Sequence, residues 1–593
     1  MGIRKDSLYR DGVFRMGNVR VLDLSGSRTL PLGNSDFRSA VRDSVVVDKS
    51  LLVADLFRSG SKATLFCRPR RFGKSLNLSM LHCYFEMAPA DSPAEAPEND
   101  VFASMAIWDE DAGAFRKHHR AYPVIHLSFN NTKAQTWYEG RRSIEENIVG
   151  EYLRHGYLAE STALSQEERA LFSRIAGSHG EDELPTNSLL LLSRLLFQHH
   201  GQRTVILIDE YDAPVMSASA NHYYREAVTF MKMWLTGALK DNSALAFAVL
   251  TGVQRISKES IFSDLNNLDV NTSLNVLSDE RYGFTGDEIT ALAAYLDASA
   301  AIDEVRAWYD GYRFGNVDVY NPWSVVNYFQ KGCVADVYWG NTSSNSVLGD
   351  LVRRRDAATE QKLYALMEPG GVVREPLNLS VVFPDESEVA PGALWSMLYL
   401  AGYLTTNDIE TPNNTRIRRA LRIPNAEIRE LYRTEIIERF SSIAGSRDRL
   451  FAFHEALTAG DAAAVAHELE NILLYSASFF DLASENSYHM LVLGLLFGME
   501  GYQDPLSNRE SGRGRFDIRL LPERAGLPAI TLELKFERGA DAGRLEALAA
   551  EALAQIEARA YDAEAAGSGA GSLRYGIAFS GKSLAVDVQR RSS

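Results

Sequence analysis

The sequence predicts an α/β protein with a parallel sheet in its N-terminal half, a mainly helical middle region and a smaller α/β domain at its C-terminus. Three patterns predict this fold class. Residues 62–85 combine a short apolar strand, a basic turn and a helix, residues 204–212 form an apolar run that ends in carboxylates, and the late strand 529–536 carries Glu533 and Lys535. Charges in a buried strand are unfavourable unless they meet a partner or a ligand, so these patterns also mark candidate sites.

The composition narrows the class of protein. The length of 593 residues allows about three to four domains of ~150 residues each. The net charge of -16 argues against a protein that coats nucleic acid through its whole surface, although it permits a local basic groove. Cys67, Cys83 and Cys333 lack the spacing of a metal site or a disulfide framework. Since we find no signal peptide and no apolar run near ~18 residues, we expect a cytoplasmic protein without a membrane partner.

The basic turn at residues 68–75 has the form of a phosphate-binding loop. A strand–turn–helix segment presents backbone N–H groups and the positive end of a helix to phosphate. Lys74 would reach the β- and γ-phosphates of ATP and the Ser75 hydroxyl would hold Mg²⁺, but Arg68 stands where the GxxxxGK[ST] motif has its first glycine. A solvated basic turn before a helix gives much the same pattern. The turn residues expected to contact the nucleotide are Arg70, Arg71, Phe72, Gly73, Lys74 and Ser75.

Strands and helices alternate around this turn, which favours a P-loop NTPase fold with a parallel sheet and flanking helices. The acidic, Pro- and Ala-rich residues 88–99 interrupt the alternation as a surface loop. The expected strands are 45–50, 62–67, 122–129, 204–212 and 245–251, and the expected helices are 76–85, 137–157, 187–199 and 223–239.

The strand at 204–212 supplies the carboxylates of the candidate nucleotide site. Its four consecutive apolar residues indicate burial on both faces, and ligands of open α/β sheets bind at the carboxyl ends of such strands. Asp209 would hold Mg²⁺ through water and Glu210 would polarise the attacking water. Alone, an acidic turn after a buried strand is an equally good explanation. Together with Lys74 and Ser75 upstream, the pattern predicts ATP binding.

Polar residues after the strand 245–251 lie where they could sense the γ-phosphate. Thr251, Gln254 and Arg255 are all candidates, and we include Thr251 and Arg255 among the expected nucleotide contacts. An N-capping Thr and a surface Arg are equally good interpretations of these two residues.

Seven segments together resemble the AAA-ATPase-like family of bacterial proteins that also carry a C-terminal PD-(D/E)XK-type nuclease domain. Arg68 in place of glycine is usual for this family. The resemblance implies an ATPase of the additional-strand, catalytic-Glu type fused to a metal-dependent nuclease fold, and it is weakest at residues 1–35 and 340–450. The matching segments are 68–75, 207–212, 250–252, 260–267, 282–285, 308–312 and 319–323.

The middle of the chain predicts helices with bulky aromatic anchors, which we interpret as core rather than as a base-stacking platform. The pattern at 394–424 predicts a helix followed by a β-hairpin, as in a winged-helix module whose wing binds DNA or packs against another domain. Helices at 426–440 and 451–476 lead to the C-terminal domain. The aromatic anchors are Trp308, Tyr309, Tyr312, Trp323 and Tyr328.

The C-terminal strands carry the second candidate site. Glu533 and Lys535 are two residues apart and project from one face of their strand, and Asp517 lies one hairpin earlier. This arrangement holds Mg²⁺ in restriction-type nucleases, where carboxylates bind the metal and the metal lowers the pKa of a bound water. Lys535 would orient that water or stabilise developing charge. We therefore predict a restriction-endonuclease-like domain with these three catalytic residues; a Glu–Lys ion pair on an edge strand is the alternative.

Further residues are candidate members of this second site. Glu485, at the start of the preceding helix, would complete the metal shell. Gln555 and Tyr561 occupy the places of the family's accessory Gln and Tyr. Arg513 and Arg515, near Glu510, are candidates for contacts with DNA phosphates, although solvated turn charges explain them almost as well.

These observations predict an ATPase that gates Mg²⁺-dependent cleavage of nucleic acid, with DNA favoured over RNA. The alternative is an ATP-switched binding or scaffold protein whose nuclease-like domain recognises a partner or a nucleic-acid end without cleaving it. A homo-oligomer is compatible with the sequence, because ATPases of this class often complete the site with a neighbour's Arg. The expected domains are an N-terminal extension (1–35), the P-loop domain (36–285), a helical lid and winged-helix linker (286–450) and the nuclease-like domain (451–593).

Overall fold

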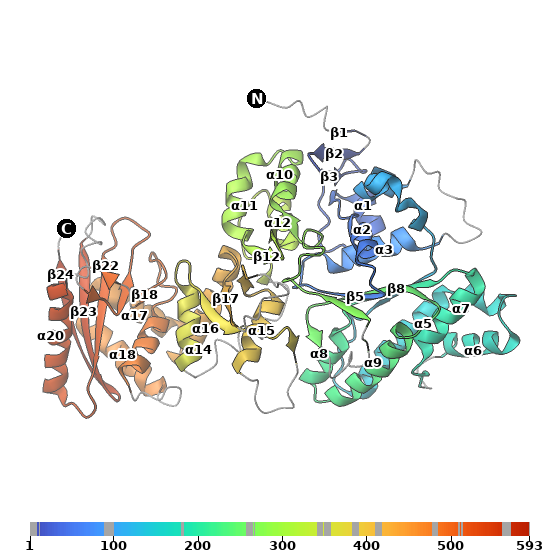
Figure 1. Ribbon diagram of the computed structural model, residues 1–593. Coiled ribbons are helices and arrows are strands. Elements are labelled where there is room, and N and C mark those ends of the chain that lie inside the picture. Colours follow the sequence, from blue (N-terminus) through green and yellow to red (C-terminus); the bar gives the residue numbers. More distant parts are fainter. Residues whose placement is uncertain are drawn as a thin grey trace. The chain divides into compact units, whose positions relative to one another are not determined.

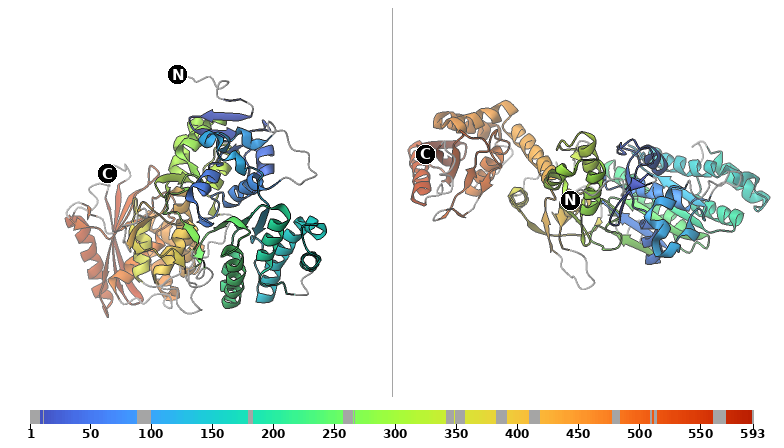
Figure 2. Two further views of the ribbon diagram at one scale, coloured as in Figure 1. Left: turned by 45° about the vertical axis from the view of Figure 1, so that its right-hand side comes forward. Right: turned by 90° about the horizontal axis from the view of Figure 1, so that it is seen from above.

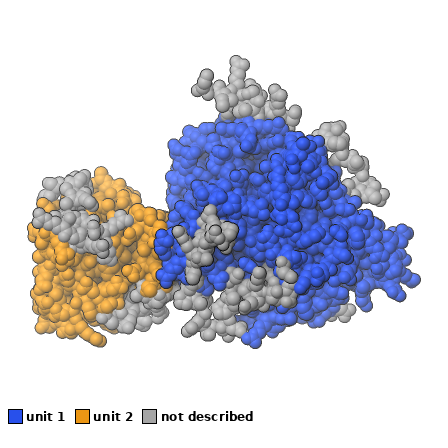
Figure 3. Space-filling view, viewed as in Figure 1, with its two compact units in different colours: residues 1–342, 374–427 blue, residues 343–373, 428–593 orange. Residues whose placement is uncertain are grey.

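The computed structural model places the chain in an α/β architecture with two compact units (Figure 3), residues 1–342 with 374–427 and residues 343–373 with 428–593. The surface loop expected at 88–99 lies outside the described residues. Within the described part of the chain, no helix has the length and apolar character needed to cross a membrane. The residues described are 9–10, 12–87, 100–178, 183–256, 265, 267–340, 348, 357–381, 391–408, 418–476, 484–507, 510–511, 514–559 and 571–591.

A five-stranded parallel sheet forms the centre of the first unit and confirms the predicted fold class for this half of the chain. Its strand order is β10-β5-β8-β7-β6, so β8 lies between β5 and β7. Sequence analysis does not predict β10, a four-residue strand at the edge of the sheet. The strands are β5 (Ala63–Cys67), β6 (Val124–Ser128), β7 (Thr204–Asp209), β8 (Leu245–Gly252) and β10 (Leu268–Asn271).

Helices cover both faces of this sheet (Figure 1, Figure 2), with α3 on one face and α5, α7 and α9 together on the other. Ile144, Leu192 and Trp234 from the second group form a buried cluster with strand residues such as Leu65 and Ile206. These helices agree with the predicted ones to within a few residues. They are α3 (Lys74–Phe85), α5 (Trp137–Arg154), α7 (Ser188–His200) and α9 (Tyr224–Leu239).

The residues before the parallel sheet form a small antiparallel sheet, to which the predicted strand 45–50 contributes β4, whereas the other three strands are not predicted by the sequence. It has the order β1-β2-β3-β4, and the helices α1 and α2 follow in the same region. Its strands are β1 (Tyr9–Arg10), β2 (Val13–Met16), β3 (Val19–Leu22) and β4 (Val46–Val47), and the helices are α1 (Phe37–Asp43) and α2 (Leu52–Ser59).

A helical subdomain with a three-stranded antiparallel sheet follows the parallel sheet. Tyr309, Tyr312 and Tyr328 are buried in it, while Trp308 and Trp323 are partly buried against its core. This burial supports the interpretation of the aromatic residues as packing anchors. The elements are β11 (Phe284–Thr285), α10 (Gly286–Tyr295), α11 (Ile302–Tyr309), β12 (Tyr312–Phe314), β13 (Val317–Tyr320) and α12 (Pro322–Gln330).

The predicted helix and hairpin at 394–424 are present. Helix α15 precedes two strands, β16 and β17, that pair antiparallel, and β14 joins them in a three-stranded sheet. A role for this element in binding DNA stays a prediction. The elements are α14 (Ala357–Met367), β14 (Val373–Pro376), α15 (Pro391–Ala401), β16 (Thr405–Thr406), β17 (Arg418–Arg422) and α16 (Ala426–Ile443).

The second unit contains a five-stranded mixed sheet of the order β18-β21-β22-β23-β24, which confirms the predicted C-terminal α/β domain. Only β22 and β23 pair in parallel, and α20 connects them. The strands are β18 (Leu506–Ser507), β21 (Ile518–Leu520), β22 (Ala529–Phe536), β23 (Ser572–Ser580) and β24 (Ser583–Arg591). The helices are α17 (Arg447–Ala459), α18 (Ala462–Ser476), α19 (Glu485–Leu495) and α20 (Ala542–Arg559).

Two consecutive residues of β23 determine how helices pack on this sheet. Tyr575 donates a 2.7 Å hydrogen bond to the carbonyl of Leu457 in α17. Gly576 faces α20, where an added Cβ would lie 2.0 Å from the carbonyl oxygen of Ala549. Because successive side chains of a strand point to opposite faces, α17 and α20 lie on opposite sides of the sheet. The glycine lets α20 approach the strand closely.

Glu427, in the first turn of α16, is a buried carboxylate that organises the backbone of the first unit. It is 0% exposed and accepts hydrogen bonds from the N–H groups of Tyr338 (2.8 Å) and Trp339 (2.7 Å) and from the Ser324 hydroxyl (2.7 Å). Burial raises its pKa from the ordinary value of 4.5 to about 7. Since the carboxyl binds its proton more tightly in the folded chain, this group makes folding less favourable as the pH rises from 4.5 to about 7.

We predict that Glu427→Gln removes this pH dependence, because the amide keeps the acceptor for both N–H groups and does not titrate. Urea unfolding of the variant at about pH 5 and about pH 7.5 should show a smaller loss of stability than the wild type. Glu427→Ala should lower the free energy of unfolding by about 1–3 kcal/mol at both pH values, because it leaves two buried N–H groups unpaired. Equal pH dependence in Glu427→Gln and wild type would contradict this assignment.

Candidate nucleotide and nuclease sites

The loop between β5 and α3 exposes the N-terminus of a helix. Gly73 caps α3 with a left-handed backbone (φ 80°) and gives its first N–H groups no side-chain cap, and Arg71 is also left-handed (φ 69°). Ser75 is the second residue of the helix and is half-buried. Uncapped N–H groups at the positive end of a helix suit an anionic ligand such as a phosphate.

Lys74 is buried in this loop and points at its backbone. Its ammonium donates to the carbonyl oxygens of Arg68 (3.1 Å) and Pro69 (2.9 Å). An ammonium has three donors, so these two bonds engage two of them and the third suits a phosphate oxygen. Burial lowers the pKa of Lys74, and the neighbouring carboxylates of Glu210 and Asp209 oppose that shift.

The side chains of the other turn residues differ in burial, and those of Arg70 and Arg71 interact electrostatically with Glu210. Phe72 is buried against the rings of Tyr312 and Phe314, both at 5.0 Å, so its backbone alone can contact a nucleotide. The guanidinium of Arg71 lies 4.2 Å from the centroid of the Trp323 ring. Arg70 is exposed.

The carboxylates of Asp209 and Glu210, at the end of β7, interact electrostatically with the Lys74 ammonium. Their environments differ. Asp209 is 3% exposed and accepts hydrogen bonds from the Thr251 hydroxyl and from the N–H of Glu210. Glu210 has a left-handed backbone (φ 50°), which is unfavourable for a residue with a Cβ and is frequent at active sites. Burial raises the pKa of Glu210 and Lys74 acts in the opposite direction.

Asn130, which sequence analysis missed, contacts Glu210 directly. With its amide nitrogen turned toward Glu210, Asn130 donates to both carboxylate oxygens at 2.7 and 2.6 Å and accepts from the Ser128 hydroxyl at 3.2 Å. Asn130 follows β6, the parallel neighbour of β7. The sequence indicated this contact only through the position of Asn130 directly after the predicted strand 122–129, because the carboxyl ends of parallel strands share one edge of a sheet.

The loop after β8 is held by the two residues that follow Glu210. Asp212 accepts from the N–H groups of Val253 (2.9 Å) and Gln254 (2.8 Å). The Tyr211 hydroxyl donates to the carbonyl of Gln254 (2.7 Å). An added Cβ at Gly252 would lie 2.7 Å from both Asp212 and the Tyr211 ring, so the close contact requires glycine.

The three candidate γ-phosphate sensors therefore have different environments. Thr251 is bound to Asp209 and lies at the candidate site. Gln254 is 3% exposed, and its side-chain oxygen has no hydrogen-bond partner among the described residues. Arg255 is half-buried in β9 (Arg255–Ile256), which pairs with β15 (Ser380–Val381).

The second site brings together side chains from β22, α20 and the start of β21. The antiparallel pairing of Ile518 with Leu532 places Asp517 beside Glu533, and Asp517 accepts from the N–H of Leu534 at 2.8 Å. Gln555 of α20 donates to Glu533 and accepts from the Lys535 ammonium at 2.8 Å. The Lys535 nitrogen lies 3.8 Å from Glu533. Asp517, Glu533, Lys535 and Gln555 thus converge as the sequence suggested.

The electrostatics of this group favour a cation. Glu533 is 2% exposed, and one of its oxygens has no hydrogen-bond partner among the residues that the structure describes. Burial, and then the Asp517 carboxylate, raise the pKa of Glu533 to about 8. A buried carboxylate with an unpaired oxygen beside a second carboxylate is the kind of donor set that a hard divalent cation binds.

No described contact links the other predicted members to the site. Glu485 is exposed at the N-terminus of α19, and no three His, Cys, Asp or Glu side chains within the described ranges are grouped to hold a metal ion. Its role as a ligand stays a prediction. Arg513 and Tyr561 lie outside the described residues, as do the side chains of Glu510 and Arg515.

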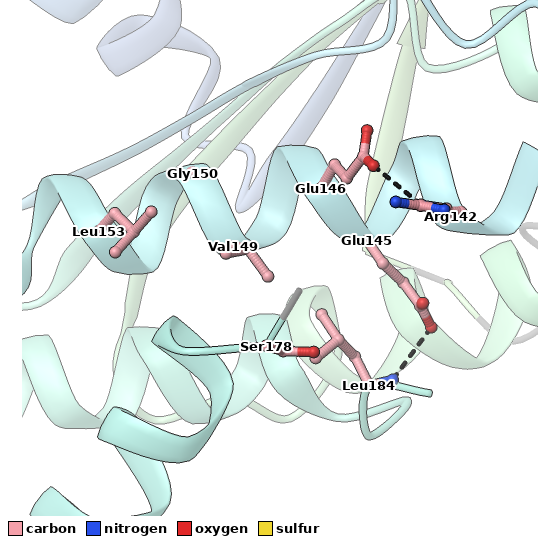
Figure 4. A pocket seen from close by; sticks show the side chains of 8 residues that line it. All are labelled: Arg142, Glu145, Glu146, Val149, Gly150, Leu153, Ser178 and Leu184. Carbon is pink, nitrogen blue, oxygen red and sulfur yellow. Dashed lines mark hydrogen bonds and ion pairs between the residues drawn. The ribbon is translucent and has the colours of Figure 1, made fainter. Parts of the chain in front are cut away.

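A surface cavity of the first unit is lined by residues other than the predicted site residues (Figure 4). Its volume is about 290 Å³, and it is lined by α5 between Arg142 and Leu153 and by Ser178 and Leu184. Glu145 in its wall already accepts from the N–H of Leu184 at 3.1 Å. The cavity contains no residue that the sequence patterns single out.

Comparison with known proteins agrees with the two predicted domains. A family model described as "Predicted AAA-ATPase" matches residues 31–262, and a model of the PD-(D/E)XK nuclease superfamily matches residues 483–589. A protein of Azotobacter chroococcum mcd 1, named "Uncharacterized protein in vnfD 5'region", is 28% identical over 421 residues, which cover 70% of each chain. The chain therefore combines an AAA-ATPase-like domain at residues 31–262 with a C-terminal domain of the PD-(D/E)XK nuclease superfamily at residues 483–589.

Proposed function

We propose that this protein is a nuclease controlled by ATP: its N-terminal domain binds and hydrolyses ATP, and its C-terminal domain cleaves phosphodiesters of nucleic acid, DNA in preference to RNA. The observation that carries the proposal is the grouping of the buried Glu533 with the half-buried Asp517 and Lys535, because a buried carboxylate with charged neighbours and a strongly shifted pKa is typical of a functional site. The cytoplasm is the proposed location.

In the N-terminal domain, the N–H groups of α3 and the Lys74 ammonium would bind the phosphates of ATP. Ser75 and Asp209 would hold Mg²⁺, which neutralises charge on phosphate oxygens when bound. Glu210 would orient and deprotonate the attacking water, and Asn130 holds that carboxylate in place. Thr251, fixed by Asp209, lies beside this group.

In the C-terminal domain, Asp517 and Glu533 would hold Mg²⁺, which activates water when bound. Lys535 would stabilise negative charge that develops on the phosphate. Gln555 restrains both Glu533 and Lys535 through its amide, so that neither side chain has to be ordered when substrate binds.

A second candidate function is an ATP-switched scaffold whose nuclease-like domain binds a partner without cleaving it. Two observations favour it: the pKa of Glu533 is raised to about 8, which weakens its affinity for a metal at neutral pH, and Glu485 is exposed. Binding of nucleic acid without cleavage by the wild-type protein would support this alternative.

Glu210→Gln should retain ATP binding and lose ATP hydrolysis, because the amide keeps the size of the side chain but cannot accept a proton. We expect a fall in the turnover rate of about 10²–10⁴-fold, measured as phosphate release. Glu226→Gln, an exposed Glu on α9, is the matched control and should be unaffected. A wild-type rate in Glu210→Gln would exclude Glu210 as the base.

Lys535→Ala should lose Mg²⁺-dependent cleavage of DNA while it still binds DNA, because only the charge beside Glu533 is removed. We expect a fall of at least about 10²-fold in the cleavage rate, measured on labelled DNA with Mg²⁺ and ATP. Lys582→Ala, at the exposed turn after β23, is the control. Equal cleavage by Lys535→Ala and wild type would contradict the assigned site.

Binding of Mn²⁺ to the C-terminal site should tighten with rising pH. A cation competes with the proton on Glu533, whose pKa is raised to about 8. The affinity should therefore rise by up to about tenfold per pH unit below about pH 8 and level off above it. Calorimetric titration in an Asp209→Asn background, which removes the carboxylate proposed to hold a cation in the N-terminal domain, isolates the C-terminal site, and Glu533→Gln should abolish the remaining binding. A pH-independent affinity between about pH 6 and about pH 8 would be inconsistent with this site.

A further inference from the structure

We propose that Arg68 is the positioning residue of the phosphate-binding loop: its buried guanidinium fixes the carbonyl oxygens that hold Lys74. The inference deepens the proposed ATP binding and rests on it. Arg68 stands where the phosphate-loop pattern has a glycine, so the pattern assigns no role to a side chain at this position.

The Arg68 side chain ties the start of the loop to the neighbouring edge strand. It is 1% exposed, and its guanidinium donates to the carbonyl oxygens of Cys67 (3.0 Å) and Asn271 (3.1 Å) and to the side-chain oxygen of Asn271 (2.7 Å). Asn271 ends β10, which pairs with β5 up to Phe66. Two donors on one neighbour use the planar fork that distinguishes Arg from Lys.

The same guanidinium lies near two aromatic rings that pack against residues on either side of the turn. Its carbon lies 5.1 Å from the centroid of Tyr282 and 5.2 Å from that of Phe314. Tyr282 packs on Phe66, before the loop, at 5.1 Å, and Phe314 packs on Phe72, within the loop, at 5.0 Å. Arg68 therefore contacts the packing on both sides of the turn at once.

The backbone of Arg68 connects this anchor to Lys74. Its N–H donates to the carbonyl of Gly252 on β8 (3.1 Å), and its carbonyl, with that of Pro69, accepts from the Lys74 ammonium. Anchoring the side chain and the N–H of one residue restricts the direction of its carbonyl. The anchor thereby sets the position from which Lys74 would meet a phosphate.

Burial argues against direct binding of ATP by Arg68, whose Nε has no hydrogen-bond partner among the described residues. The side chain is directed toward β10 and its named acceptors are carbonyl and amide oxygens of the protein. An effect of Arg68 on ATP affinity must then pass through the loop and through Lys74. Residues that act through one another show non-additive effects when both are changed, whereas independent residues do not.

The test is a double-mutant cycle on ATP affinity, measured by equilibrium binding of ATP to the full chain. Lys74→Ala should weaken binding by at least about tenfold, and Arg68→Lys, which keeps the charge but loses the fork, by about fivefold. In the double variant the affinity should equal that of Lys74→Ala within about twofold. A combined loss equal to the product of the two single losses would overturn the inference.

The substitution Asn271→Ala tests the same inference without changing Arg68. It removes the acceptor on β10 and should weaken ATP binding in the wild-type background but not in the Lys74→Ala background. A loss in both backgrounds would overturn the inference. If Lys74→Ala itself binds ATP like wild type, the proposed nucleotide site fails, which distinguishes that failure from the failure of the positioning role.

Discussion

The burial of the Lys74 ammonium is the constraint on which the N-terminal domain depends. A cation inside a protein is tolerated only where acceptors and opposite charges surround it. The acceptors are carbonyl oxygens of its own loop, and the opposite charges, Asp209 and Glu210, arrive at the end of β7. The parallel sheet, with β8 between β5 and β7, is what brings these separate parts of the chain to one edge.

The C-terminal domain also buries a charged group, which here is a carboxylate instead of an ammonium. Glu533 is buried beside Asp517, and a cation, Lys535, and an amide, Gln555, accompany it. The close approach of α20 at Gly576, which pairs with Glu533 across the sheet, allows the helix to present Gln555 to the strand. Both domains thus place charge in the interior where an anion or a divalent cation could complete the set.

Much of this arrangement is readable from the sequence, because apolar runs such as β7 and β22 are strong local signals and their charged residues stand out against them. The convergence of Asp517, Glu533 and Lys535 and the neighbourhood of Lys74 and Asp209 follow from such signals and from the family resemblance.

The short strands β1–β3 and β10 were missed, because strands of two to four residues are specified by their partners rather than by their own pattern. The contacts of Asn130, Arg68 and Tyr211 were also missed, because each of them joins segments that are distant in the chain. Phe72 was expected to touch a nucleotide, yet its side chain packs against the aromatic residues that follow the sheet.

We propose that phosphate and divalent cations bind at two separate places in this chain. Anomalous scattering from crystals soaked with Mn²⁺ and a non-hydrolysable ATP analogue would locate both sites in one experiment. We expect the analogue to lie on the loop before α3 with one Mn²⁺ at Ser75 and Asp209, and a second Mn²⁺ between Asp517 and Glu533. Nucleotide bound away from Lys74, or Mn²⁺ bound elsewhere while Glu533 remains uncoordinated, would contradict the claim.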